Sequence, residues 1–160
     1  MRRFAAVGVL WLLAGCGYRF GGGVLPGGGR EVFAPVFVNH TSEPGLETLF
    51  TEAFRQQLGR AGIDGGEGSS TRVEGEVMAT FGAPTILTTD GRLASYRVHA
   101  TVRLRLVKAQ DVLAQTEVSG SEDYLPGADV LASESNRQAA LRRLAESLMR
   151  DGYENLAASW

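Results

Sequence analysis

The sequence predicts a single α+β domain over residues 31–160, a two-layer sandwich with two helices packed on one face of a roughly four-stranded mixed sheet. Three observations predict this fold class. Apolar periodicities occur in the order strand, helix, three strands, helix, with no internal repeat. Asp90-Gly91 is a strong signal for a tight turn between two strands. Residues 96–106 alternate apolar and polar side chains without a break, which is typical of a half-buried strand.

The first strand is expected at residues 31–38. Pro35 has no backbone N–H to donate to a neighbour, so the strand should lie at a sheet edge or carry a bulge there. Alternation divides its side chains into two sets, with Val32, Ala34, Val36 and Val38 on one face and Phe33 and Phe37 on the other.

A helix is expected from Leu46 to Ala61. Ser42 or Glu43 is the expected N-terminal cap, Pro44 suits the first turn, and Gly62 is a stop signal. The apolar positions follow helical spacing and form one stripe for packing on a sheet: Leu46, Leu49, Phe50, Ala53, Phe54, Leu58 and Ala61.

Three further strands should form an antiparallel meander, with a second turn at about 109–111 and a third strand at 112–120. The inward set of the first of these strands is Val73, Gly75, Val77, Ala79 and Phe81. The inward set of the second is Tyr96, Val98, Ala100, Val102, Leu104 and Leu106.

The outward row of that second strand is cationic and comprises Arg97, His99, Arg103 and Arg105. Such a row could attract a polyanion, for instance a phosphorylated lipid. Charged side chains are also expected at alternate outward positions, where Glu74, Glu76 and Glu117 could pair with the arginines.

The last helix is expected to begin after a 124–129 loop, with Ser133 or Ser135 as its cap. Gly152 is expected to bend or fray its end, and Trp160 could pack on the domain or contact a partner. Its apolar stripe is Ala140, Leu141, Leu144, Ala145, Leu148 and Leu156.

Residues 1–15 have the features of a secretory signal: two arginines followed by an apolar run too short to span a membrane. The ending Leu13-Ala14-Gly15-Cys16 resembles a bacterial lipobox, in which the cysteine is acylated and becomes the mature N-terminus. The alternative is a plain secretory signal that happens to precede a cysteine. With its acyl chains, Cys16 would hold the protein on a membrane, and the glycine-rich segment 16–30 would act as a tether.

Composition narrows the function classes. Removal of Arg2 and Arg3 leaves 14 of the 16 basic residues against 18 acidic ones, so a nucleic-acid partner is not expected. Cys16 is the single cysteine, and His40 and His99 are the only histidines. We therefore expect no metal, no cofactor and no enzymatic activity, since a hydrolase would have to be assembled from scattered Ser and Asp residues.

Several motifs, in this order, resemble the lipopolysaccharide (LPS) assembly lipoprotein LptE family. They begin with Cys16-Gly17-Tyr18 and the strand that contains Pro35. They are followed by an Asn-x-Thr-x-Glu-Pro-Gly-Leu-Glu entry to the first helix, which starts at Asn39 and ends at Glu47. The likeness continues through Asp90-Gly91-Arg92 and the strand beginning near Tyr96, to Val130-Leu131-Ala132.

This resemblance implies a non-catalytic role at the inner leaflet of the outer membrane, facing the periplasm or a barrel lumen. Members of the family plug the LptD β-barrel translocon, help it assemble, and bind LPS during its transport. The family's basic LPS-contacting positions lie near the hairpin tip and before the last helix. The tip here has one base, Arg92, and the segment 131–134 has none, so Arg92 and Arg97 are the candidate LPS contacts. The alternative function is another outer-membrane-anchored binding or scaffold lipoprotein, such as a pilotin.

Overall fold

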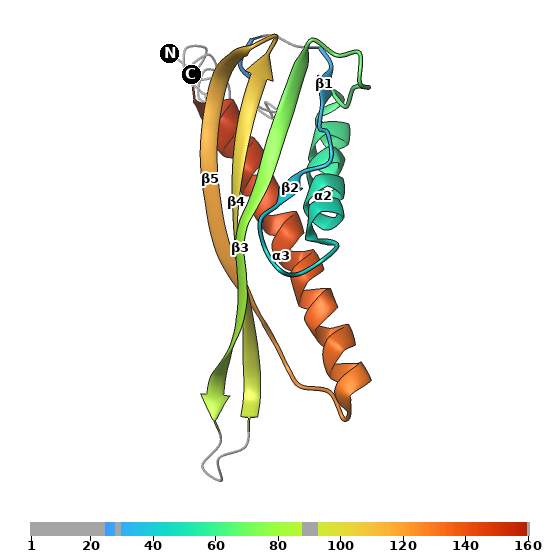
Figure 1. The fold of residues 1–160 in the computed structure, drawn as a ribbon, viewed down its shortest axis with the longest axis vertical. Coiled ribbons are helices and arrows are strands. Elements are labelled where there is room, and N and C mark those ends of the chain that lie inside the picture. The colour runs from blue at the N-terminus through green and yellow to red at the C-terminus, as the bar shows by residue number, and fades with distance from the viewer. Residues whose placement is uncertain (1–24, 28–29, 88–92, 160) are drawn as a thin grey trace, which may run out of the picture.

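The computed structural model describes residues 25–27, 30–87 and 93–159 of the 160-residue chain. The expected leader, Cys16, Arg92, the Asp90-Gly91 turn and Trp160 lie outside these residues. The elements, in chain order, are β1 (Val32–Phe33), β2 (Val38–Asn39), α2 (Leu46–Ala61), β3 (Thr71–Leu87), β4 (Leu93–Lys108), β5 (Asp111–Tyr124) and α3 (Val130–Ala158) (Figure 1).

The predicted α+β class is confirmed. The sheet order is β1-β3-β4-β5, with β2 also paired to β3. β1 and β2 run parallel to β3, whereas β3, β4 and β5 are antiparallel neighbours. The two helices contact each other and pack on the same face of the sheet (Figure 1). The opposite face, here called the open face, bears the alternate side chains of β3, β4 and β5.

The expected first strand is split into β1 and β2, so the sheet has five strands instead of four. Pro35 lies in the break, at the sheet edge as predicted. The backbone groups of the break are satisfied by α2: Arg55 Nε and Nη2 donate to the Ala34 carbonyl, and the Phe37 N–H donates to Thr51 Oγ1.

The predicted face assignment fails after Pro35. Val36 and Val38 are exposed, whereas Phe37 is buried beneath α2. Gly75 makes this possible, because a Cβ on Gly75 would lie 2.4 Å from Phe37 Cδ2. The break therefore rotates the chain and delivers an aromatic ring to the core.

A β-bulge in β3 also overturns a predicted face. Val77 pairs with Val102 and Ala79 with Thr101, which leaves Met78 without a partner. Val73 and Val77 are buried as predicted, but Ala79 and Phe81 are exposed. The Phe81 ring lies 4.7 Å from the His99 ring on the open face.

The alternation predicted for β4 is confirmed from Val98 to Leu106, where Val98, Ala100, Val102, Leu104 and Leu106 are buried, whereas Tyr96 is only half-buried. The predicted second turn is also present: Ala109 and Gln110 connect Lys108 to its partner Asp111, and Ala109 has a φ of 55°. β5 continues to Tyr124, four residues past its expected end at Gly120.

The caps predicted for both helices are wrong. Gly45, with a φ of 87°, occupies the N-cap of α2 and provides no side chain. In α3 the cap is Asp129, whose carboxylate accepts from the Ala132 N–H at 2.7 Å. Ser133 instead accepts from the Gly127 N–H. The helix therefore begins about one turn earlier than expected.

Gly152 neither bends nor ends α3, which continues to Ala158. A Cβ on this residue would lie 2.4 Å from Leu104 Cδ1 and 3.8 Å from Val118 Cγ2. Gly152 thus lets the helix backbone lie directly on β4 and β5.

The predicted apolar stripe of α3 is buried throughout, as are most positions of the α2 stripe. Leu25, which lies inside the expected tether, is 1% exposed and joins this core. Within the described residues, no helix has the length and apolar character needed to cross a membrane.

The start of α2 is organised by Asn39 through a set of side-chain hydrogen bonds. Its amide donates to the Glu43 carbonyl and to Glu47 Oε2, and its oxygen accepts from the Thr41 backbone and hydroxyl. Glu47 Oε1 accepts from the Gly45 N–H. Asn39 thus fixes the entry to the helix in place of a local cap.

We expect Asn39→Ala to lower the free energy of unfolding by about 1–3 kcal/mol, because it leaves partly buried donors and acceptors unpaired. The matched control is Ser42→Ala at the exposed, sequence-predicted cap, which should change it by less than about 0.5 kcal/mol. Chemical denaturation of both variants is the measurement. A larger decrease in the free energy of unfolding for Ser42→Ala than for Asn39→Ala would contradict the role of Asn39 at the helix start.

Candidate functional site

One end of the molecule, here called the hairpin pole, comprises residues 83–87, 93–97 and 122–133. It contains the arms of the β3–β4 hairpin and the connection from β5 to α3 (Figure 1). The last β4–β5 pair is Tyr96 with Tyr124, so the arms extend past the end of β5. Their outermost residues pair only with each other.

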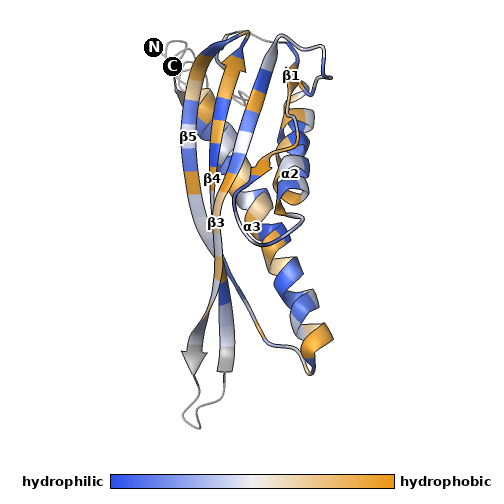
Figure 2. Cartoon of the chain, in the orientation of Figure 1, coloured by the Kyte–Doolittle hydropathy of each residue, from blue (hydrophilic) through white to orange (hydrophobic). Residues whose placement is uncertain are grey.

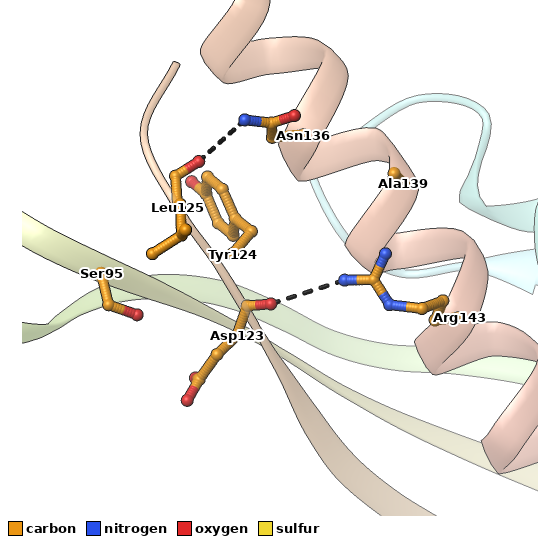
Figure 3. Close-up of a pocket in the computed structure, with 7 residues that line it drawn as sticks. All are labelled: Ser95, Asp123, Tyr124, Leu125, Asn136, Ala139 and Arg143. Carbon is orange, nitrogen blue, oxygen red and sulfur yellow. Dashed lines mark hydrogen bonds between the residues drawn. The ribbon is translucent and has the colours of Figure 1, made fainter.

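A pocket of about 340 Å³ opens between the arms, the end of β5 and α3. Its lining residues are Ser95, Asp123, Tyr124, Leu125, Asn136, Ala139 and Arg143 (Figure 3). The pocket exists because α3 diverges from the sheet toward its N-terminus: its buried residues begin only at Ala140.

Two side chains of α3 reach across this divergence to the backbone of β5 and its extension. Asn136 Nδ2 donates to the Leu125 carbonyl at 3.0 Å, and Arg143 Nη2 donates to the Asp123 carbonyl at 3.5 Å (Figure 3). Arg143 also lies 3.7 Å from the Glu122 carboxylate. The guanidinium is half exposed and borders the pocket, so it adds a positive charge that the sequence had not indicated.

Arg97, a predicted site residue, forms a two-point ion pair with Asp123. Its Nε and Nη2 donate to the two carboxylate oxygens at 2.7 and 2.9 Å. The hydrogen bond from Arg97 lowers the pKa of Asp123, and the same bond raises the pKa of Arg97. Both side chains are about half exposed. An anion that binds Arg97 must therefore share it with Asp123. Arg92, the other predicted contact, lies outside the described residues.

The other arginines of the cationic row are paired on the open face, as the cross-strand interpretation predicted. Arg103 contacts Glu117 at 3.1 Å, and Arg105 contacts Glu74 and Glu76 at 3.2 Å each. This pairing supports the structural interpretation of Arg103 and Arg105 over a polyanion site.

The hairpin pole also carries exposed apolar side chains that were not predicted. Val130 and Leu131 in the first turn of α3 are 87% and 81% exposed, and Leu125 is 66% exposed. Figure 2 shows this first turn as a hydrophobic end on an otherwise mixed helix. Nearby, the rings of Tyr96 and Tyr124 stack with centroids 5.4 Å apart, and burial raises the pKa of Tyr124. Apolar and cationic side chains thus share one end of the molecule.

A second hollow, of about 760 Å³, lies between the start of α2 and α3. It is crossed by Arg137, which donates to the Glu43 carboxylate and also pairs with Glu134 at 3.3 Å. These bonds fix α3 against the Asn39-organised entry to α2. No group of three or more metal-ligating side chains occurs within the ranges that the structure describes.

The fold and the hairpin pole define an α+β domain with an amphipathic end. The family model for LptE, described as lipopolysaccharide-assembly, matches residues 30–156. The chain therefore belongs to the LptE family of LPS-assembly lipoproteins. No curated protein matches the sequence.

Solved structures share this fold at low sequence identity. Rare lipoprotein B from Shewanella oneidensis is 12% identical with a TM-score of 0.56, covering 81% of this chain and 96% of that one. A putative lipoprotein from Caulobacter crescentus is 15% identical with a TM-score of 0.54, covering 76% and 88%. A PelC dodecamer from Paraburkholderia phytofirmans is 16% identical with a TM-score of 0.52, covering 81% and 90%.

We expect Arg97→Gln to raise the pKa of Asp123 toward its ordinary value of 3.8, because the two-point hydrogen bond is lost. Since the folded-state pKa is lowered, the pair stabilises the fold above the unfolded pKa, and this contribution is lost as the pH falls through the folded value. Carboxyl-carbon NMR titration measures the shift. Arg103→Gln is the control and should leave the pKa of Asp123 unchanged. The same pKa of Asp123 in Arg97→Gln as in the wild type would refute the pairing.

Proposed function

We propose that this chain is an outer-membrane lipoprotein, anchored by acyl chains on Cys16 at the inner leaflet. In this role it plugs and helps assemble the LptD β-barrel and assists the delivery of LPS to the outer leaflet. The observation that carries the proposal is the family match over residues 30–156. The lipobox-like sequence at Cys16 supports the anchor.

The charge pattern of the domain supports a plug. Ion pairs across β3, β4 and β5 neutralise the arginines and glutamates of the open face and leave a polar, locally balanced surface. Such a surface suits the polar interior of a large β-barrel. Attachment to the same membrane would also raise the effective concentration of the plug near its barrel.

The position of residues 25–27 supports a particular orientation of the domain relative to the membrane. Lys108 Nζ donates to the Gly27 carbonyl at 3.0 Å, which places residues 25–27 beside the β4–β5 turn. This turn lies at the end of β4 opposite the β3–β4 hairpin (Figure 1). A lipid on Cys16 would thus hold one end of the domain near the membrane, and the hairpin pole would be directed away from that attachment point.

The hairpin pole supports direct contact with LPS, because an anionic glycolipid requires both cationic and apolar partners. Arg92 and Arg97 are the proposed contacts for its anionic groups. Arg143 lies beside the pocket next to the Arg97–Asp123 pair, and Val130 and Leu131 offer apolar area. Arg143 compensates for the absence of a base in 131–134.

We expect Arg92→Glu/Arg97→Glu to weaken LPS binding about tenfold or more, because the substitutions place carboxylates where the anionic groups of LPS would otherwise meet cations. Binding of purified LPS is measured directly, with thermal unfolding recorded to confirm the fold. Arg30→Glu/Arg60→Glu makes the same charge change at residues outside the hairpin pole and serves as the control. Binding as tight as wild type in the first variant would refute the role of these arginines.

The partnership with the barrel is tested by affinity purification of the acylated protein from solubilised outer membrane. We expect a large β-barrel of the LptD type to be recovered in stoichiometric amounts. An unrelated outer-membrane lipoprotein with the same tag is the control. Recovery of the intact protein without a barrel would contradict the proposal and favour a different scaffold or pilotin-like role.

A further inference from the structure

We propose that the outer edge of β5, over residues 114–124, receives an extended segment of the partner protein as an added strand. The identity of that partner as the barrel protein rests on the proposed function above. The docking edge itself follows from the backbone pairing and the charge pattern of β5.

The outer edge of β5 has no strand beside it in the described parts of the chain. β5 pairs with β4 alone, in an unbroken register from Ala114 opposite Leu106 to Tyr124 opposite Tyr96. In an antiparallel pair, alternate residues direct both N–H and C=O away from the neighbouring strand. The segment 114–124 therefore presents a row of backbone donors and acceptors to an incoming strand.

The two edges of the sheet differ in how they are protected. At the opposite edge, β1 and β2 have two residues each, Pro35 separates them, and side chains of α2 occupy the intervening backbone groups. The segment 114–124 contains no proline or lysine. The one register shift between β4 and β5 leaves Leu113 without a partner, and it lies before this segment. Short strands, a proline and side-chain contacts to the backbone thus protect the first edge, whereas the segment 114–124 has only its acidic side chains for protection.

The helices leave this edge accessible. α3 packs on the face of β5 through Val118 and Gly120, where a Cβ would lie 3.1 Å from Leu148 Cδ2. Figure 1 shows β5 at the border of the sheet, away from β1 and β2, with α3 against its face. An added strand would extend the sheet sideways without displacing either helix.

The charges of the segment favour a basic partner strand over a second copy of this chain. It contains Glu117, Glu122 and Asp123 and no basic residue. The bases that these acids contact lie on β4 and α3, on the inner side of the strand. A second β5 would add three more acids, and like charges on facing strands are destabilising. A segment with Lys or Arg among hydroxyl side chains complements this edge.

The origin of the added strand within the partner follows from barrel geometry. The wall of a closed barrel has no free strand edge, because all its backbone groups are paired within the wall. The added strand must therefore come from a loop or turn segment of the barrel protein that reaches the lumen.

The test is amide-resolved hydrogen exchange on the full acylated chain, alone and in complex with its barrel. We expect alternate amides in 114–124, those not bonded to β4, to exchange about tenfold more slowly in the complex. Amides of α2 serve as the internal control and should not change. This period-two pattern distinguishes strand pairing from simple burial.

Three results would overturn the inference while the barrel still co-purifies: no new protection in 114–124, equal protection of both sets of amides, or the same pattern at high concentration of the chain alone. The last result would assign the edge to a second copy. If no barrel co-purifies, the proposed function fails, and this inference fails with it.

Proline substitution provides a second test. Because outward N–H groups alternate, one of Gln115→Pro and Thr116→Pro removes a bond to β4, and the other removes only an edge donor. The variant that keeps its bond to β4 is the one that unfolds at the higher temperature. We expect this variant to reduce the recovery of the barrel at least about tenfold. Gln115→Ala and Thr116→Ala retain the N–H and are the controls. Wild-type recovery by the stable proline variant would overturn the inference.

Discussion

The close approach of α3 to the sheet is the constraint on which the rest of the structure depends. Gly152 and Gly120 have no side chain at the contact, so Leu104 and Leu148 pack directly against backbone. A long straight helix held this closely at one end must diverge from a twisted sheet at the other. The same contact that completes the core therefore leaves the first ten residues of α3 exposed or half-buried and opens the pocket beside Arg143.

The abundant ion pairs have a different role from the apolar core. Exposed pairs such as Arg97 with Asp123 are screened by solvent and contribute little to stability, which therefore depends mainly on burial between the helices and the sheet. The pairs on the open face instead cancel charge locally. A partner that meets this face encounters little net field and must recognise shape and hydrogen bonds, whereas the hairpin pole combines charge with apolar area.

Sequence patterns predicted the features that depend on periodicity and missed those that depend on register. The alternation of β4 and the stripes of both helices were correct, and Pro35 marked the sheet edge. The bulge at Met78 was not visible, because Ala79 and Phe81 continue the apolar alternation. Arg97 was recognised as a candidate, but its partner Asp123 lies on a strand that was expected to stop at Gly120. The exposed Val130 depends on where α3 begins, which was predicted one turn too late because the cap is Asp129 and not a serine. Arg143 reaches the Asp123 carbonyl, which lies on the part of β5 that was not expected.

The projecting arms of the β3–β4 hairpin suggest how such a domain can adapt to different partners. Beyond Tyr96, the outermost arm residues pair only with one another, so the core places no requirement on the number of those pairs. Residues inserted or deleted two at a time on each arm would preserve the faces of both strands while changing how far the hairpin extends. The hairpin can thus change its length beyond the buried Ser95 while the side chains from Val98 to Leu106 keep their places in the core.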